Sequence, residues 1–156
     1  MINGKLLKQY DMPVALGITH LTTIAFLLNS SEDMPSWVAA YAYFFASTCI
    51  LLSNIFQPTK GFLSGIAVAT FIATVIRSIR ISSLNLHGPG VDFPLGLMGA
   101  GAGVIAALIY SKSNTGWAIG GGFTIGCVGT LGGYLLTMIF ACNTVLYCGP
   151  TFSWGF

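Results

Sequence analysis

The stretch from Gly96 to Phe140 constrains this chain most, because it is largely apolar and yet holds more than half of the chain's 20 glycines. In a water-soluble helix each glycine would cost about 1 kcal/mol relative to alanine. In a bilayer the helix is enforced, since every backbone N–H and C=O group must find a partner within the protein. Glycine then allows another backbone to approach closely. We therefore interpret this stretch as two membrane-spanning helices with small-residue faces.

The composition supports a membrane environment. Of the 156 residues, 54% are hydrophobic and only 6% are charged, whereas a soluble domain carries about 25% charged residues. So few charges cannot cover a water-facing surface of this size. The net charge of +2 comes from scattered lysines and arginines without a basic stripe, which argues against a nucleic-acid partner.

The apolar segments predict an all-α, polytopic transmembrane helix bundle, with residues 1–156 forming a single integral membrane domain. A spanning helix needs about 20 residues. We expect five spans, at about residues 12–28, 36–56, 61–81, 94–110 and 116–141, with four spans as the alternative because two segments are short. With five spans, four lysines share the side of the N-terminus, and the positive-inside rule places that side toward the cytoplasm or matrix.

Three acidic residues precede a proline by two positions. In Asp11-Met-Pro13, Asp33-Met-Pro35 and Asp92-Phe-Pro94, we expect the aspartate to cap a helix and the proline to lie in its first turn. These caps use three of the four acidic residues. The membrane core then holds no pair of carboxylates for acid–base catalysis. We therefore expect no enzyme activity, with no catalytic residue, metal site or bound cofactor.

The glycines recur at helical spacing. In the last predicted span, Gly122, Gly126, Gly129 and Gly133 fall within a stripe about 60° wide when residues are placed 100° apart. A similar ridge of glycine and alanine runs along the third and fourth spans. We predict that these residues pack helices against one another, within the chain or between subunits, and a lipid or small-ligand groove is the alternative. The predicted packing residues are Gly61, Gly65, Gly96, Gly99, Gly103, Gly122, Gly126, Gly129 and Gly133.

His20 is the strongest single candidate for a functional residue. It lies in the middle of the first predicted span, with Thr19, Thr22 and Thr23 close to it in the sequence. An ionisable group at such a depth is a functional candidate by default. One interpretation is a neutral imidazole that makes a polar contact with a neighbouring helix or with the threonines. The others are a haem or metal ligand, a proton relay, or, with Thr19 and Thr23, the lining of a pore. His87 is expected to be a loop residue.

Two further pairs carry candidate roles. Arg77 and Arg80 lie one turn apart near the end of the third span, where we expect them to reach toward the lipid headgroups. Pairing with Asp92 or with a lipid phosphate is the alternative. Cys142 and Cys148 flank the end of the last span, and five intervening residues allow a disulfide if that end faces an oxidising compartment.

The opening Lys8-Gln9-Tyr10-Asp11-Met12-Pro13 resembles that of a small accessory membrane subunit of mitochondrial respiratory complex I. That subunit belongs to the preprotein and amino acid transporter family, related to the inner-membrane translocases. The family's arginine, aspartate and glycine cluster are similar to Arg80, Asp92 and Gly99–Gly103. The family has four spans, so segment 36–56 would be an addition. The resemblance implies a structural subunit of the mitochondrial inner membrane without catalytic residues of its own.

Two classes of function follow. The first is a non-catalytic structural or accessory subunit of a larger membrane complex, such as a respiratory-chain complex. Its partners would be other membrane protein subunits and lipids. The alternative is an oligomeric pore or small-solute permeation protein, including a viral lysis pore. An enzyme or electron carrier would require a bound haem or metal.

Overall fold

The computed structural model describes residues 4–28, 36–56, 58–84, 92–113 and 119–144. Together they form a bundle of α-helices, as the sequence predicts. The helices are α1 Gly4–Leu28, α2 Ser36–Ile55, α3 Phe62–Leu84, α4 Asp92–Ser113 and α5 Ile119–Thr144.

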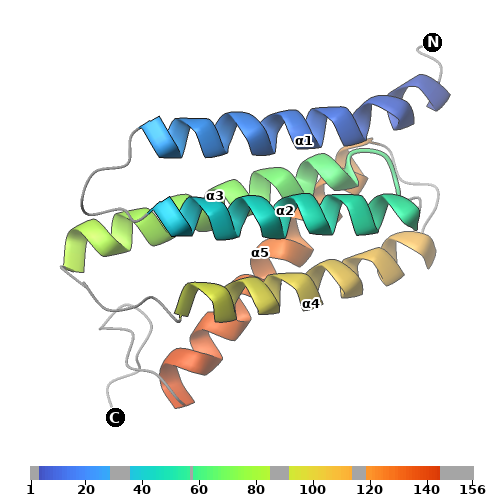
Figure 1. Ribbon diagram of the computed structural model, residues 1–156. Helices are drawn as coiled ribbons and strands as arrows, with labels where there is room; N and C mark the ends of the chain where they lie inside the picture. The colour runs from blue at the N-terminus through green and yellow to red at the C-terminus, as the bar shows by residue number, and fades with distance from the viewer. Residues whose placement is uncertain (1–3, 29–35, 57, 85–91, 114–118, 145–156) are drawn as a thin grey trace.

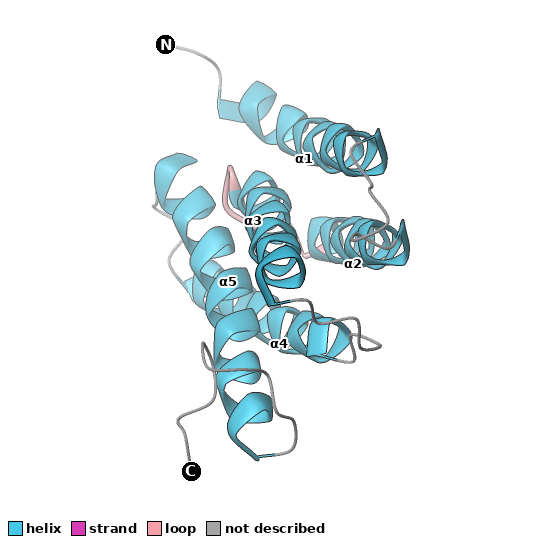
Figure 2. Ribbon diagram, turned by 90° about the vertical axis from the view of Figure 1, so that its left-hand side faces the viewer, coloured by secondary structure: helices cyan, strands magenta, loops and turns pink. Residues whose placement is uncertain are grey.

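The first four helices run roughly side by side, and α5 crosses them obliquely (Figure 1). Viewed from the end of the bundle, α3 lies in the middle, with α1 and α2 on one side and α5 on the other (Figure 2). Accordingly, α3 packs against α1, α2 and α5, while α4 packs mainly against α5. The described part of the helix at the centre is therefore largely buried by its neighbours.

Four helices in the described part of the chain are long and apolar enough to cross a membrane: Tyr10–Leu28, Val38–Ile55, Phe93–Ser113 and Gly120–Asn143. The chain is thus an integral membrane protein. The described apolar stretch of α3 is shorter, Phe62–Arg77. Because its neighbours surround α3, this helix does not need a full-length apolar surface.

The predicted start of the first helix is wrong. We expected residues 12–28, with Pro13 in the first turn, but α1 begins at Gly4 and Pro13 lies inside it. A proline at this position removes one backbone hydrogen bond, which transmembrane helices tolerate when neighbouring groups compensate. By contrast, α4 does begin at Asp92. The segment Asp33–Pro35 lies outside the described residues.

The buried side chains form two clusters. One, at the end of the bundle where α4 begins, includes Phe93, Tyr134 and Met138, and the rings of Phe93 and Tyr134 meet edge to face at 6.3 Å. The other, at the opposite end, includes Ile50, Phe62 and Ile66. Both clusters also contain alanines, among them Ala73 in the first and Ala67 in the second.

Candidate functional site

The glycine stripe of α5 packs against two helices, first α3 and then, farther along, α4. Toward its start, a Cβ on Gly122 would lie 2.8 Å from Thr59 Oγ1, and one on Gly126 would meet the carbonyl of Phe62. In return, a Cβ on Gly65 of α3 would lie 2.9 Å from the backbone nitrogen of Cys127. The first half of the stripe therefore brings α5 into backbone contact with the beginning of α3.

Farther along, the same stripe packs on α4. A Cβ on Gly103 would meet the carbonyl of Gly129 and lie 3.1 Å from the Cα of Gly133, and one on Gly99 would meet Thr137. Gly96 lies against the ring of Tyr134. These glycine faces are thus occupied by contacts within the chain.

Gly61 is an exception among the predicted packing glycines. It precedes α3 rather than lying inside it, and its φ is 83°. Only glycine adopts this left-handed conformation easily. Its carbonyl accepts a hydrogen bond of 3.0 Å from the backbone N–H of Gly65. Gly61 is therefore a turn residue that starts α3, and its prediction as a helix-packing residue is wrong.

Asp11 does cap a helix, but the helix is α3 instead of its own. Its carboxylate accepts hydrogen bonds from the backbone N–H of Leu63 at 3.2 Å and of Ser64 at 3.1 Å. The Ser64 hydroxyl donates a third, at 2.5 Å. Since the first N–H groups of a helix lack partners within it, this buried carboxylate satisfies two of them. It also joins α1 to α3.

A narrow cleft with five threonines in its lining lies between α1, α2 and α3, and we call it the threonine cleft. Its volume is about 20 Å³, room for about one water molecule. It is lined by Thr19, Thr22, Thr23, Phe26, Ala39, Ala42, Tyr43, Ala46, Ala67, Thr70, Phe71 and Thr74. The structure thus places the predicted polar threonines of α1 together with two threonines of α3.

The threonine hydroxyls of the cleft hydrogen-bond within their own helices. Those of Thr22 and Thr23 both donate to the carbonyl of Thr19, at 3.0 and 2.8 Å. On α3, Thr70 donates to Ile66 and Thr74 to Thr70, at 2.9 and 2.8 Å. Each hydroxyl proton is directed at a backbone carbonyl. The hydroxyl oxygens can therefore accept hydrogen bonds from a group in the cleft but have no proton left to donate to it.

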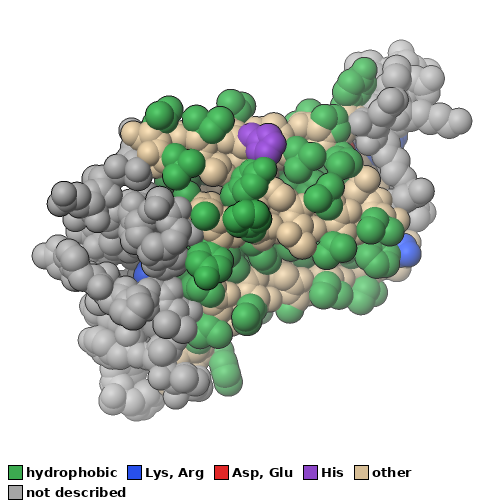
Figure 3. Space-filling model, in the orientation of Figure 1, with side chains coloured by type: hydrophobic (Ala, Val, Ile, Leu, Met, Phe, Trp, Pro, Cys, Tyr) green, Lys and Arg blue, Asp and Glu red, His purple; other side chains and the backbone are tan. Residues whose placement is uncertain are grey.

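His20 lies at the surface beside this cleft. Its ring stacks on that of Tyr43 of α2, a residue of the cleft wall, with centroids 5.2 Å apart and planes 22° from parallel. The imidazole is exposed, and Figure 3 shows it surrounded by hydrophobic side chains. Since the apolar span runs from Tyr10 to Leu28, His20 lies close to its middle. A polar ring therefore faces outward at mid-membrane depth.

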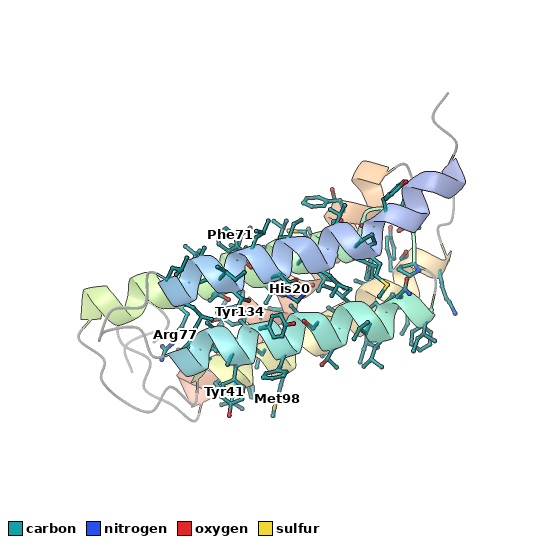
Figure 4. All side chains as sticks on the ribbon, turned by 45° about the horizontal axis from the view of Figure 1, so that its top comes forward. His20, Tyr41, Phe71, Arg77, Met98 and Tyr134 are labelled. Atoms are coloured by element: carbon teal, nitrogen blue, oxygen red, sulfur yellow. The ribbon has the colours of Figure 1, made fainter. Side chains whose placement is uncertain are left out.

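Arg77 differs from its predicted role. We expected it to reach lipid headgroups, but its side chain is only 4% exposed. It lies at the end of the bundle where α1 ends and α2 begins (Figure 4). Since the protein covers this guanidinium, a headgroup contact at Arg77 is ruled out in this arrangement. The side chains of Arg80 and Asp92 lie outside the described part, so their predicted contacts stay predictions.

The cysteines divide into two kinds. Cys49 and Cys127 are free thiols. Cys142 is disulfide-bonded, and its predicted partner Cys148 lies outside the described residues, as does the loop residue His87. Within the described part, no three side chains of His, Cys, Asp or Glu come together.

An open apolar groove runs along the outer side of α4 and α5, with a volume of about 690 Å³. Val128 and Leu136 form part of its wall, and Gly132 has no atom within 4 Å of where a Cβ would stand. Other glycines that bring α4 and α5 together, among them Gly103 and Gly129, line it as well. Glycine packing thus leaves a groove on the outer side of the same contact.

Comparison of the chain with protein-family models, with curated protein sequences and with solved structures finds no match. The argument for function therefore depends on the residues themselves. Sequence reasoning identified Thr19, His20 and Thr23 but missed Tyr43 and the threonines of α3. The spacing of Thr70 and Thr74, four residues apart, was the available signal for a shared polar face.

Proposed function

We propose that this protein is a non-catalytic structural or accessory subunit of a larger membrane assembly, and that it binds a neighbouring helix through the α1–α2 surface around His20. The observation that carries this proposal is the exposed imidazole at mid-span, stacked on Tyr43. Ionisable side chains at this depth nearly always face protein or a water-filled cavity. A partner helix with a polar group at the same depth would cover it.

The hydrogen bonds that the other polar groups already make support a non-catalytic role. The Asp11 carboxylate is engaged by Leu63 and Ser64. The cleft threonines direct their protons at backbone carbonyls. A general acid or base must have a proton to exchange with a substrate within hydrogen-bond reach. The carboxylate thus joins α1 to α3, and the threonine hydroxyls bond within their own helices.

Lipids are the second class of partner in this proposal. The groove of about 690 Å³ along α4 and α5 is almost wholly apolar, and it faces outward from two helices that can cross the membrane. We place acyl chains there and the protein partner on the opposite side of the bundle. The two kinds of neighbour would thus contact different helices.

The resemblance of Lys8–Pro13, Arg80 and Asp92 to the complex I accessory subunit gives this proposal its finer form, a respiratory complex of the mitochondrial inner membrane. Immunodetection of the tagged chain in purified mitochondria tests that form. Co-migration with a respiratory complex on a native gel would support it. Exclusive recovery in another membrane would reject the location but leave the structural role intact.

Mild-detergent extraction from the native membrane, followed by native mass measurement, tests the proposed role. We expect the chain within a larger assembly, and we expect His20→Leu to release it while the helices remain folded. A stable lone monomer from the native membrane would contradict the proposal. Visible absorption of the purified chain is a second check, because a haem band would indicate a redox role.

An oligomeric pore is the second candidate, and the threonine hydroxyls of the cleft beside His20 favour it. The cleft of one chain, about 20 Å³, is too small to conduct solutes, so a pore would have to form between copies. Ion conductance in liposomes that is lost on changing His20, Thr19 and Thr23 together would support this candidate. Tight liposomes at high protein density would exclude it.

A further inference from the structure

We propose that the neighbour on the α1–α2 surface is a second copy of this chain, and that the two His20 side chains hydrogen-bond to each other across the interface. This inference rests on the proposed function and names its partner. Two observations support it independently, the chemistry of the exposed imidazole and an open notch at Gly17.

The first observation concerns the edge of the His20 ring. Stacking on Tyr43 covers one ring face, but no hydrogen bond within the described part of the chain takes up the ring nitrogens. A neutral imidazole has one N–H donor and one acceptor nitrogen. Two copies of this group are therefore complementary to each other, whereas an ordinary acyl chain offers neither a donor nor an acceptor.

The second observation is Gly17, which lies three residues before His20 and so on the same side of α1. A Cβ at Gly17 would meet no atom within 4 Å. A Cβ on each packing glycine of α3, α4 and α5 would instead meet backbone or side-chain atoms of a neighbouring element, so Gly17 makes no comparable contact within the chain. Small residues beside a polar group are typical of helix–helix interfaces in membranes.

Symmetry favours a second copy over an unrelated helix. In a dimer with a two-fold axis along the membrane normal, each residue near the axis meets its own equivalent at the same depth. An unrelated partner would need a suitable polar residue at the level of His20. The dimer needs nothing beyond the residues already present on α1.

The experiment uses the purified full-length chain in lipid nanodiscs and liposomes, with native mass and energy transfer between labelled copies as readouts. We expect a dimer. His20→Leu should raise its dissociation constant by about tenfold or more, because interhelical hydrogen bonds are lost. His20→Gln, which keeps a donor and an acceptor, should retain most of the association.

Gly17→Leu should also weaken the dimer by closing the notch. Gly132→Leu on α5 is the matched control, since Gly132 has equally open space but lies on the opposite side of the bundle. Helix content and thermal unfolding of each variant are measured beside association. A folded His20→Leu variant that stays dimeric would overturn the inference, as would equal effects of Gly17→Leu and Gly132→Leu.

The result also separates this inference from the proposed function. A purified chain that stays monomeric in liposomes, yet is released from a native assembly by His20→Leu, would overturn the second-copy inference and leave the subunit role standing. A monomer both in liposomes and after native extraction would contradict the two together.

Discussion

The two sides of this bundle are held together by different means. Around α5, glycines bring backbones into direct contact, as Gly103 does with Gly129. Around α1, contact depends on side chains, chiefly the Asp11 carboxylate on α3 and the stack of His20 on Tyr43. Backbone contacts cannot give way when an atom is added, whereas side chains can move to another rotamer. The glycine side should therefore be intolerant of substitution, and the α1 side adaptable.

The comparison also separates what holds the chain together from what it offers to partners. The predicted packing glycines of α3, α4 and α5 are engaged inside the molecule. An exposed polar ring in mid-span occurs instead on α1. We infer that α3, α4 and α5 mainly stabilise the fold, whereas α1 binds the partner. Substitutions can then abolish one and spare the other.

The largest expected effect is that of Gly133→Leu. Its side chain would enter the backbone of Gly99 and Gly103, and overpacking against backbone should cost about 3 kcal/mol or more. We expect lost folding or a sharply lower unfolding temperature in detergent. The adjacent Gly132→Leu projects into open space and should leave the unfolding temperature nearly unchanged.

This pair of variants tests whether the α5 side of the bundle is packed through backbone contacts and so differs from the α1 side. Equal stability of Gly133→Leu and Gly132→Leu in monomeric, detergent-solubilised protein would show that α4 and α5 do not meet through their backbones. The α5 side would then be no less tolerant of substitution than the α1 side.

The next effect is that of Asp11→Ala, which removes the hydrogen bonds to Leu63 and Ser64. Loss of a helix cap costs about 0.5–2 kcal/mol, and we expect the upper part of that range because the site is buried. Denaturant titration of the purified protein measures it. Ser113→Ala, an exposed control on α4, should have no measurable effect.

A double-mutant cycle sharpens this prediction. Asp11→Ala and Ser64→Ala remove the two sides of one contact, so their effects should not add. Additive effects would mean that the Ser64 hydroxyl does not interact with the carboxylate, which would then hold α3 through backbone N–H groups alone.

The smallest effects should come from the threonines. Thr70→Val in the cleft and Thr130→Val on the glycine side each remove a hydroxyl that donates to a carbonyl of its own helix, at 2.9 and 2.8 Å. No contact between helices is lost, so each change should cost less than about 1 kcal/mol. Denaturant titration of the two single variants checks this. A loss of several kcal/mol at Thr70 would show that the cleft holds a bridging group.

Local patterns in the sequence were sufficient to predict the helices and the glycine stripe of α5, because helical periodicity and the lipid environment determine both. They could not predict that Asp11 caps α3, since its partners lie more than 50 positions along the chain. The same limit applies to Tyr43 beside His20. The start of α1 was predicted wrongly because a proline is common in a first turn, whereas here Pro13 lies inside a longer helix.

The account's central claim, that α1 rather than α5 meets the protein partner, is tested most directly by site-specific photo-crosslinking. A photoreactive residue replaces Leu21 of α1 or Leu136 of α5, which are both 70% exposed, in the purified full-length chain in liposomes. We predict that Leu21 captures a second copy and that Leu136 captures lipid alone. Capture of protein from Leu136 and of lipid alone from Leu21 would contradict the account.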